Sequence, residues 1–234
     1  MSYALCNDLR TLLWFGNQRA VEYHPTLALA DRLDHATHLV LDLDPPEGHQ
    51  GFGHSVAAAV LVKEALASVG LVGAVKTSGA KGVHVFVPID PLVSMDDAAA
   101  ATRAIARRAE LLDPALATTA FVKADRDGKV FVDATRTGGA TVVAAYSPRA
   151  RPRVPVSFPV EWADLGQIHP TDFTILTVPT ILGHRNPWAQ TMPTPQKISA
   201  DLIAEGHDIA VPRVAAMHEG KRRARASRTP QSPQ

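Results

Sequence analysis

Two aspartates, Asp42 and Asp44, end an apolar run and are the first residues whose spacing indicates chemistry. In a β-strand, side chains at positions i and i+2 project from the same face, about 6.5–7 Å apart. Two carboxylates so close repel each other unless a cation lies between them. Hard oxygen ligands of this kind suit Mg²⁺ or Mn²⁺. The pair therefore indicates a divalent metal site, and the alternative is a strand-end pair that faces solvent.

A second polar group lies in the segment 76–85, which reads KTSGAKGVHV. Its two glycines allow backbone amides to approach a ligand closely, and such a turn can bind phosphate. Side-chain donors are available from Ser78, Lys81 and His84, with Lys76 as a further candidate. The spacing and the following helix of a P-loop are both missing. The alternative is a tight β-turn with a solvated lysine.

Two later residues extend these groups. Asp133 is the lone acid of VFVDAT and ends an apolar run, as Asp44 does. Alone it is a strand-end cap or turn residue, but with the first pair it completes a three-carboxylate site of the kind used in two-metal phosphoryl transfer. Arg149 follows a predicted strand and is suited to pair bidentately with a phosphate. Its alternative is an ordinary surface arginine.

The elements that must position these residues alternate between helices and strands. Leucines at 39, 41 and 43 alternate with the residues between them, which predicts a strand with one apolar face. Ser55 is the expected N-cap of the next helix, and the helix after that is expected to start near Asp96. The order helix, strand, helix, hairpin, helix, hairpin predicts an α+β fold with a largely antiparallel sheet. The expected helices are 7–22, 55–69, 96–112 and a short one near 199–205; the expected strands are 38–46, 129–135 and 139–147, with a hairpin over 74–89; and 149–162 and 167–215 are expected to be irregular or turn-rich.

Composition narrows the class of protein. The chain has 234 residues, of which 46% are hydrophobic and 20% charged, which is typical of a soluble globular protein with one core. It has no apolar stretch long enough for a membrane span, and its first residues lack a signal-peptide layout. Cys6 is the sole cysteine, which excludes an intrachain disulfide framework and an all-cysteine metal site. We therefore expect a cytoplasmic protein with no membrane partner.

The charge is unevenly distributed although the net charge is only +1. Residues 221–234 contain five basic side chains and no acidic one, and they end in Ser, Thr, Pro and Gln. This composition predicts a disordered basic tail after a core domain over residues 1–220. The tail is either a solubilising segment or an arm that contacts nucleic-acid phosphates without reading sequence.

Four separated motifs together resemble a known family. They are LDLDPPEG, KTSGAKGVHVFVP, KVFVDAT and TVVAAYSPRARPRVPVSFPVEW. In this order they are similar to the polymerase domain of bacterial ATP-dependent DNA ligase D, which belongs to the archaeo-eukaryotic primase superfamily. Two flanking segments, NDLRTLLWFGNQRAVEYH and PTDFTILTVPTILGHRNPW, extend the likeness over about residues 7–190, most closely to stand-alone actinobacterial members.

The resemblance implies a fold, a reaction and a set of site residues. The fold would be a primase-polymerase catalytic core with an RRM-like, largely antiparallel sheet flanked by helices. The reaction would be template-directed addition of nucleotides, often ribonucleotides, to a 3′-hydroxyl with Mn²⁺ or Mg²⁺. Its partners would be a DNA primer-template, nucleoside triphosphates, and the end-joining proteins Ku and ligase, in the nucleoid-associated cytoplasm. By resemblance the metal-binding aspartates fall on Asp42, Asp44 and Asp133, the triphosphate contacts on Ser78, Lys81, His84 and Arg149, and a histidine near the active site on His24.

Two departures from the family pattern bear on function. The family's substantial N-terminal portion, which holds DNA ends, is nearly absent before the segment that matches residue 7, so we expect weak binding of DNA ends. The polar stretch after the third aspartate, usually rich in Asn or Gln, reads ATRTGG here. Two alternatives therefore stay open beside the nucleotidyltransferase: a catalytically silent nucleotide- or nucleic-acid-binding module, and a metal-dependent nuclease or phosphatase. The last explains the carboxylates but not the KTSGAKGVH segment.

Overall fold

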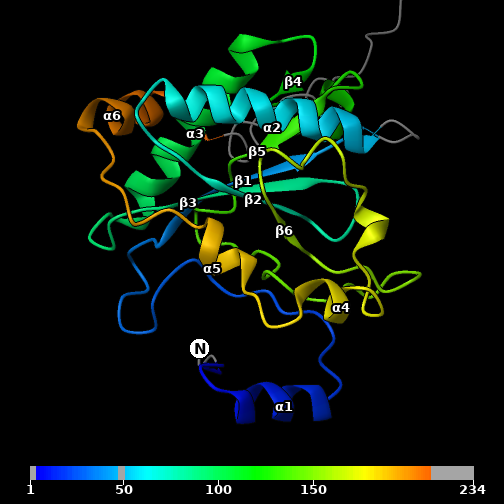
Figure 1. The fold of residues 1–234 in the computed structure, drawn as a ribbon. Coiled ribbons are helices and arrows are strands. Elements are labelled where there is room, and N and C mark those ends of the chain that lie inside the picture. The colour runs from blue at the N-terminus through cyan, green and yellow to red at the C-terminus, as the bar shows by residue number, and fades with distance from the viewer. Residues whose placement is uncertain (1–3, 47–50, 212–234) are drawn as a thin grey trace, which may run out of the picture.

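The structure, a computed structural model, describes residues 4–46 and 51–211 as an α+β fold built on one sheet (Figure 1). The helices are α1 (Leu9–Asn17), α2 (Gly51–Ala67), α3 (Met95–Leu112), α4 (Val178–Leu182), α5 (Pro187–Thr191) and α6 (Ala200–Asp208), with 3₁₀ turns at Lys123–Asp125 and Pro170–Asp172. The strands are β1 (His38–Asp44), β2 (Ala74–Thr77), β3 (Val83–Pro88), β4 (Ala117–Thr118), β5 (Val130–Asp133) and β6 (Pro159–Val160).

The six strands form one sheet in the order β4-β5-β1-β3-β2-β6. All neighbouring pairs are antiparallel except β4 and β5, which are parallel. Helices α2 and α3 pack on one face of the sheet, and α6 packs against α3 (Figure 1). The predicted fold class, α+β with a largely antiparallel sheet flanked by helices, is therefore confirmed.

Strand β1 is the centre of the core and is covered on both faces. Leu39, Leu41 and Leu43 are fully buried against the layer of α2 and α3. On the opposite face Val40 packs in a second buried cluster with Phe86, its cross-strand partner. The prediction of a single apolar face was wrong for this half of the strand, because loops cover the second face there. The polar end of the same face carries the aspartates.

Two helix boundaries differ from the sequence prediction. Helix α2 begins at Gly51, so Ser55 lies inside it, where its hydroxyl donates to the Leu43 carbonyl oxygen at 3.3 Å. Helix α3 is capped by Ser94, whose side chain accepts a hydrogen bond from the amide of Asp97. In both cases the serine hydroxyl satisfies a backbone group, the Leu43 carbonyl oxygen or the Asp97 amide.

The first helix was predicted in the right place but is shorter than expected. Asp8 caps α1, whose last residue is Asn17, and Arg19 follows with a positive φ of 67° that ends the helical path. None of its residues is buried. Among the described residues, no helix is long and apolar enough to cross a membrane.

The segment 139–147 is not the strand that its apolar pattern predicted. Its first part contacts residues 23–26, through an isolated bridge between Thr141 and Thr26 and through backbone hydrogen bonds, and its last two residues hydrogen-bond to the backbone of Ser157. Tyr146 has a positive φ of 67°, which an extended strand does not allow. The sheet position beside β2 is taken by β6, from a segment predicted to be irregular.

Candidate active site

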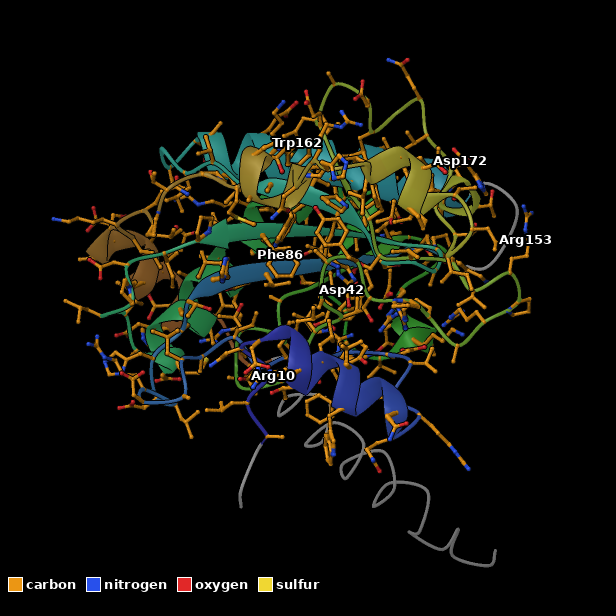
Figure 2. The ribbon with its side chains drawn as sticks, turned by 60° about the horizontal axis from the view of Figure 1, so that its bottom comes forward. Arg10, Asp42, Phe86, Arg153, Trp162 and Asp172 are labelled. Atoms are coloured by element: carbon orange, nitrogen blue, oxygen red, sulfur yellow. The ribbon has the colours of Figure 1, made fainter. Side chains whose placement is uncertain are left out.

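Four polar residues form one row across four neighbouring strands. Lys76 of β2 lies opposite His84 of β3, His84 opposite Asp42 of β1, and Asp42 opposite Asp133 of β5. Residues directly opposite each other in an antiparallel sheet share a face and have Cβ atoms about 4.5–5.5 Å apart. All four are buried, on the face away from α2 and α3. Figure 2 brings this face forward and shows Asp42 near Phe86.

Hydrogen bonds connect three members of this row. The Lys76 ammonium Nζ lies 3.0 Å from His84 Nδ1 and 2.5 Å from the Ser157 hydroxyl, and His84 Nε2 lies 3.1 Å from Asp42 Oδ1. An ionised carboxylate can only accept, so His84 carries its proton on Nε2, toward Asp42, and accepts from Lys76 at Nδ1. The Nε2–H group then donates to Asp42. The row therefore fixes both the tautomer and the orientation of the imidazole.

Burial controls the charge of the basic members. It lowers the pKa of the Lys76 ammonium to about 7, because the charged form has lost its water. Burial also lowers the pKa of His84, and the nearby charge of Lys76 adds to that effect. We conclude that His84 is neutral in the folded protein at neutral pH. Its role toward Asp42 is that of a hydrogen-bond donor.

Arg136 joins the acidic end of the row. Its Nε and Nη2 atoms lie 3.0 and 2.9 Å from Asp42 Oδ2, and its Nε lies 3.5 Å from Asp133 Oδ2. Asp133 Oδ1 accepts a hydrogen bond from the Thr135 amide at 2.8 Å. Sequence reasoning missed Arg136 as a site residue, although it lies in the ATRTGG stretch that departs from the family pattern.

The three aspartates form one electrostatic group. Burial acts to raise the pKa of Asp42, but His84 and Arg136 outweigh it and hold that pKa well below its usual range. Asp44 is the exposed member of the three. Desolvation of its carboxyl by surrounding protein, with the negative charges of Asp42 and Asp133, raises the pKa of Asp44 to about 6. The group thus carries more negative charge than its surroundings balance.

The donor set has the chemistry of a divalent metal site. Asp42, Asp44 and Asp133 offer hard oxygen ligands, and the Arg136 guanidinium already lies against two of them as a stand-in cation. Within the described ranges, no three His, Cys, Asp or Glu side chains are yet arranged to hold a metal ion. The residues therefore fit Mg²⁺ or Mn²⁺ in kind, with Arg136 in the position of the cation.

The turn between β2 and β3 lies next to the polar row. The Ser78 hydroxyl accepts hydrogen bonds from the amides of Gly82 and Ala80, at 3.1 and 3.2 Å, and so closes the turn. Gly82 packs so tightly on β1 that an added Cβ would overlap the Leu43 carbonyl oxygen. Lys81 is exposed and has no ion pair with any residue of the described segments. The turn therefore presents the exposed Lys81 ammonium on a backbone that is held by Ser78 and by the close packing of Gly82.

Arg149 reaches this turn from a loop, because the strand that was predicted to precede it does not form. Its Nη1 donates to the Ser78 carbonyl oxygen at 2.6 Å. Gly79 makes room for it: its φ is +68°, and a Cβ there would lie 2.7 Å from Arg149 Cγ. Gly79, which was predicted to let backbone amides approach a phosphate, thus also leaves room for the Arg149 side chain.

Glu22, which sequence reasoning missed, connects Arg149 with His24. Its Oε2 lies 3.1 Å from Arg149 Nε and 2.9 Å from His24 Nε2, and its Oε1 accepts from the Ala150 amide at 2.6 Å. The hydrogen bond from His24 is the main cause that lowers the pKa of Glu22 to about 2. The predicted phosphate contact Arg149 and the predicted active-site histidine His24 therefore share one carboxylate partner.

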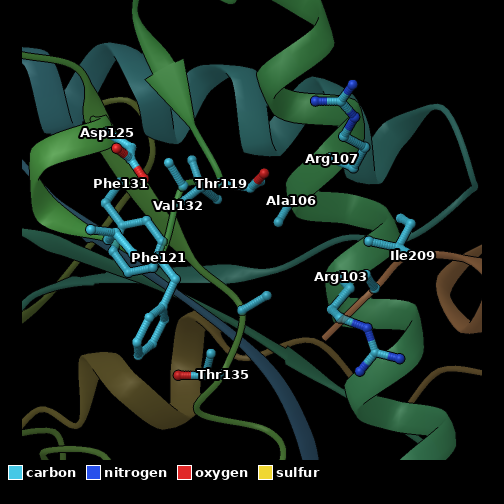
Figure 3. A pocket seen from close by; sticks show the side chains of 14 residues that line it. Arg103, Ala106, Arg107, Thr119, Phe121, Asp125, Phe131, Val132, Thr135 and Ile209 are labelled. Atoms are coloured by element: carbon cyan, nitrogen blue, oxygen red, sulfur yellow. The ribbon is translucent and has the colours of Figure 1, made fainter. Parts of the chain in front are cut away.

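A cavity of about 440 Å³ lies apart from this site, between α3 and the outer side of β5 (Figure 3). Phe121 and Phe131 form part of its apolar wall, and Arg103 and Arg107 of α3 also line it. None of the eight predicted site residues lines it. It shares β5 with the acidic site without opening onto the predicted residues.

Comparison with known proteins gives a consistent match. A family model described as the LigD primase-polymerase domain matches residues 1–188. The non-homologous end joining DNA repair protein LigD of Mycobacterium tuberculosis is 36% identical over 173 residues, which are 70% of this chain and 23% of that protein. The bifunctional LigD of Bacillus subtilis is 32% identical over 180 residues, 75% of this chain and 29% of that protein. The chain thus spans about a quarter of the length of these relatives.

A solved structure agrees. The polymerase domain of Mycobacterium tuberculosis ligase D, in complex with DNA, superposes with a TM-score of 0.68 at 33% sequence identity. The match covers 78% of this chain and 68% of that one.

Proposed function

Because this chain belongs to the LigD primase-polymerase domain family, we propose that it is a metal-dependent nucleotidyltransferase that extends a DNA primer on a template. The primer 3′-hydroxyl oxygen attacks the α-phosphorus of a nucleoside triphosphate. A new P–O bond forms, the bond to the β-phosphate oxygen breaks, and pyrophosphate leaves. The setting we propose is end-joining repair in the nucleoid, beside Ku and a ligase. The relatives' names support end-joining repair, and the solved polymerase domain in complex with DNA supports DNA as the partner.

The observation that carries the proposal is the position of Asp42 directly opposite Asp133, with His84 as the next member of the row. Carboxylates on one face of adjacent strands are what a phosphoryl-transfer metal site requires. The turn that we propose binds phosphate joins β2 and β3, and β3 is the strand next to β1. The proposed metal ligands and the proposed triphosphate contacts therefore lie next to each other, as the reaction requires.

The chain's own residues would divide the work as follows. Asp42, Asp44 and Asp133 would hold Mn²⁺ or Mg²⁺, which supplies activation of the hydroxyl and neutralisation of the leaving phosphate when bound. Lys81 and the turn amides would bind the triphosphate, with positive charge aimed at oxygens that gain negative charge in the transition state. Other predicted phosphate contacts are Ser78, His84 and Arg149, with His24 behind Arg149.

A catalytically silent binding module is the second candidate, and two observations favour it. Arg136 already pairs with Asp42 and Asp133 in the place of a metal, and the Ser78 hydroxyl is used within the turn. Such a module would bind DNA or nucleotide without transfer. A nuclease or phosphatase is a third candidate, but it does not explain the exposed Lys81 and the turn of the KTSGAKGVH segment.

The test is incorporation of labelled nucleotide on a primer-template with Mn²⁺, with Asp42→Asn and Asp133→Asn beside the unaltered chain. We expect extension by the unaltered chain and a loss of at least about 100-fold in both variants, since each removes a ligand charge. Primer shortening in place of extension would identify a nuclease. Binding of the primer-template that survives chelation, with no extension at any metal concentration, would identify the silent module.

A further inference from the structure

We propose that Arg136 is an internal counter-ion that a divalent metal must displace from Asp42 and Asp133, and that this residue thereby sets the metal affinity of the site. The inference rests on the proposed function, because it takes the two aspartates as metal ligands. It assigns to Arg136 a role that neither the sequence motifs nor the family match provides.

The contacts of Arg136 are those of a cation that bridges two ligands. The guanidinium pairs with Asp42 Oδ2 through two nitrogens, at 2.9 and 3.0 Å, and approaches Asp133 Oδ2 at 3.5 Å. Metal ions and guanidinium groups both neutralise carboxylate oxygens, so these atoms cannot serve both at full strength. An incoming ion would also meet the positive charge of Arg136 at close range. The metal and the Arg136 guanidinium therefore compete for the Asp42 and Asp133 carboxylates.

The competition does not weaken over the working pH range. The two aspartates raise the pKa of Arg136 further above a value that is already very high, although burial acts in the opposite direction. A guanidinium therefore stays charged wherever the protein is folded. By contrast the His84 ring on the other side of Asp42 is neutral and donates one hydrogen bond. The metal must therefore displace the Arg136 guanidinium in its charged form, because the guanidinium does not lose its proton in this pH range.

The backbone around Arg136 is fixed, while its side chain has room to leave. The next residue, Thr137, is fully buried, and its hydroxyl accepts hydrogen bonds from the Val40 amide at 2.9 Å and from Thr102 at 3.2 Å. The Arg136 side chain is 34% exposed. Displacement therefore requires a rotation of one side chain toward solvent and no movement of the strand.

The experiment measures metal binding directly, by calorimetric titration of Mn²⁺ into the full chain without DNA or nucleotide. Arg136→Gln removes the charge and keeps a polar side chain of similar reach. We expect it to bind Mn²⁺ about tenfold or more tightly than the unaltered chain, because a charge within 4–6 Å changes such equilibria by one to three powers of ten. Arg107→Gln is the matched control: it removes the same charge from an arginine that pairs with Glu110 on α3. We expect no change in it.

Thermal unfolding gives a second readout. Without metal, Arg136→Gln should melt at a lower temperature than the unaltered chain, because Asp42 and Asp133 then repel each other. Mn²⁺ should raise the melting temperature of Arg136→Gln by more than that of the unaltered chain. If the glutamine variant does not fold, Arg136→Lys replaces it, since it keeps the charge and loses the paired geometry; its Mn²⁺ affinity should still rise severalfold.

The outcomes separate this inference from the proposed function. Equal or weaker Mn²⁺ binding by a folded Arg136 variant would overturn the role of Arg136 and leave the metal site intact. Absence of Mn²⁺ binding in every chain, the Arg136 variants included, would overturn both. Tighter binding in Arg136→Gln and in Arg107→Gln alike would reduce the effect to net charge and would also overturn the inference.

Discussion

Lys76 Nζ lies 3.0 Å from His84 Nδ1, in a part of the sheet where the lysine has no exposure and the histidine is 3% exposed. A lysine so deeply buried has lost its hydration, and its remaining partners are His84 and the Ser157 hydroxyl. Its hydrogen bond to Nδ1, on the side of the ring opposite Asp42, makes it the residue that orients His84 toward Asp42. This relationship leads to the first prediction.

The stability of the protein should rise with pH above neutrality because of Lys76. Its pKa is about 7 in the folded state, against 10.5 for a lysine that is fully exposed, as in the unfolded chain. Below pH 7 Lys76 is protonated in both the folded and the unfolded state. Between pH 7 and 10.5 it is protonated mainly in the unfolded state, so the free energy of unfolding rises with pH. We expect a gain of roughly 2–4 kcal/mol between pH 7 and 10, measured by denaturant unfolding.

The comparison that isolates Lys76 uses Lys76→Met and the exposed Lys197→Met. The gain should disappear in Lys76→Met and persist in Lys197→Met. The free energies of unfolding of Lys76→Met and of the unaltered chain could instead change equally between pH 7 and 10. That result would show that Lys76 keeps an ordinary pKa in the folded state.

Glu22→Gln should weaken the use of nucleoside triphosphate. The change removes the charge that holds Arg149 and His24, so both become free to leave the turn. Loss of a charge-assisted hydrogen bond costs roughly 1.5–3 kcal/mol, which corresponds to about a tenfold or larger rise in KM. Steady-state primer extension measures it, with kcat expected to change less. The exposed Glu64→Gln is the control, and an unchanged KM in Glu22→Gln would contradict a positioning role.

Gly82→Ala should destabilise the fold and Gly16→Ala should not. A methyl group at Gly82 would overlap the Leu43 carbonyl oxygen, and that backbone belongs to the central strand and cannot yield easily. We expect a loss of roughly 1–3 kcal/mol in the free energy of unfolding. Gly16 lies in α1 with open space around it, so alanine should stabilise that helix by up to about 1 kcal/mol. Equal melting temperatures for the two variants would show that β3 can shift away from β1.

Deletion of residues 221–234 tests the hypothesis that the basic tail contacts DNA. The segment lies outside the described residues, so this prediction depends on composition alone. Each phosphate contact contributes about −0.7 to −0.9 to the slope of log affinity against log salt. If the tail contacts DNA, its deletion should make that slope less steep by a few contacts. The same slope in both chains would assign the tail to solubility.

Sequence alone determined the features that depend on neighbours along the chain. Alternation of leucines with the residues between them predicted β1 and put Asp42 and Asp44 on one face, since side-chain direction in a strand is a local property. The apolar run before Asp133 predicted β5, and the glycines of 79–82 predicted the turn between β2 and β3. Local pattern failed at 139–147, because a strand forms only where a partner strand is available.

Only the tertiary structure decided which of these residues meet. The row from Lys76 through His84 and Asp42 to Asp133 depends on strand order and register, which are set by packing across the whole sheet. Arg136 and Asp42 are 94 positions apart, and neither has a local pattern that predicts the pair. The same holds for Glu22 and Arg149, which are 127 positions apart. Charge pairs between distant segments leave no periodic trace in a sequence, because their partners are brought together by the burial of other residues.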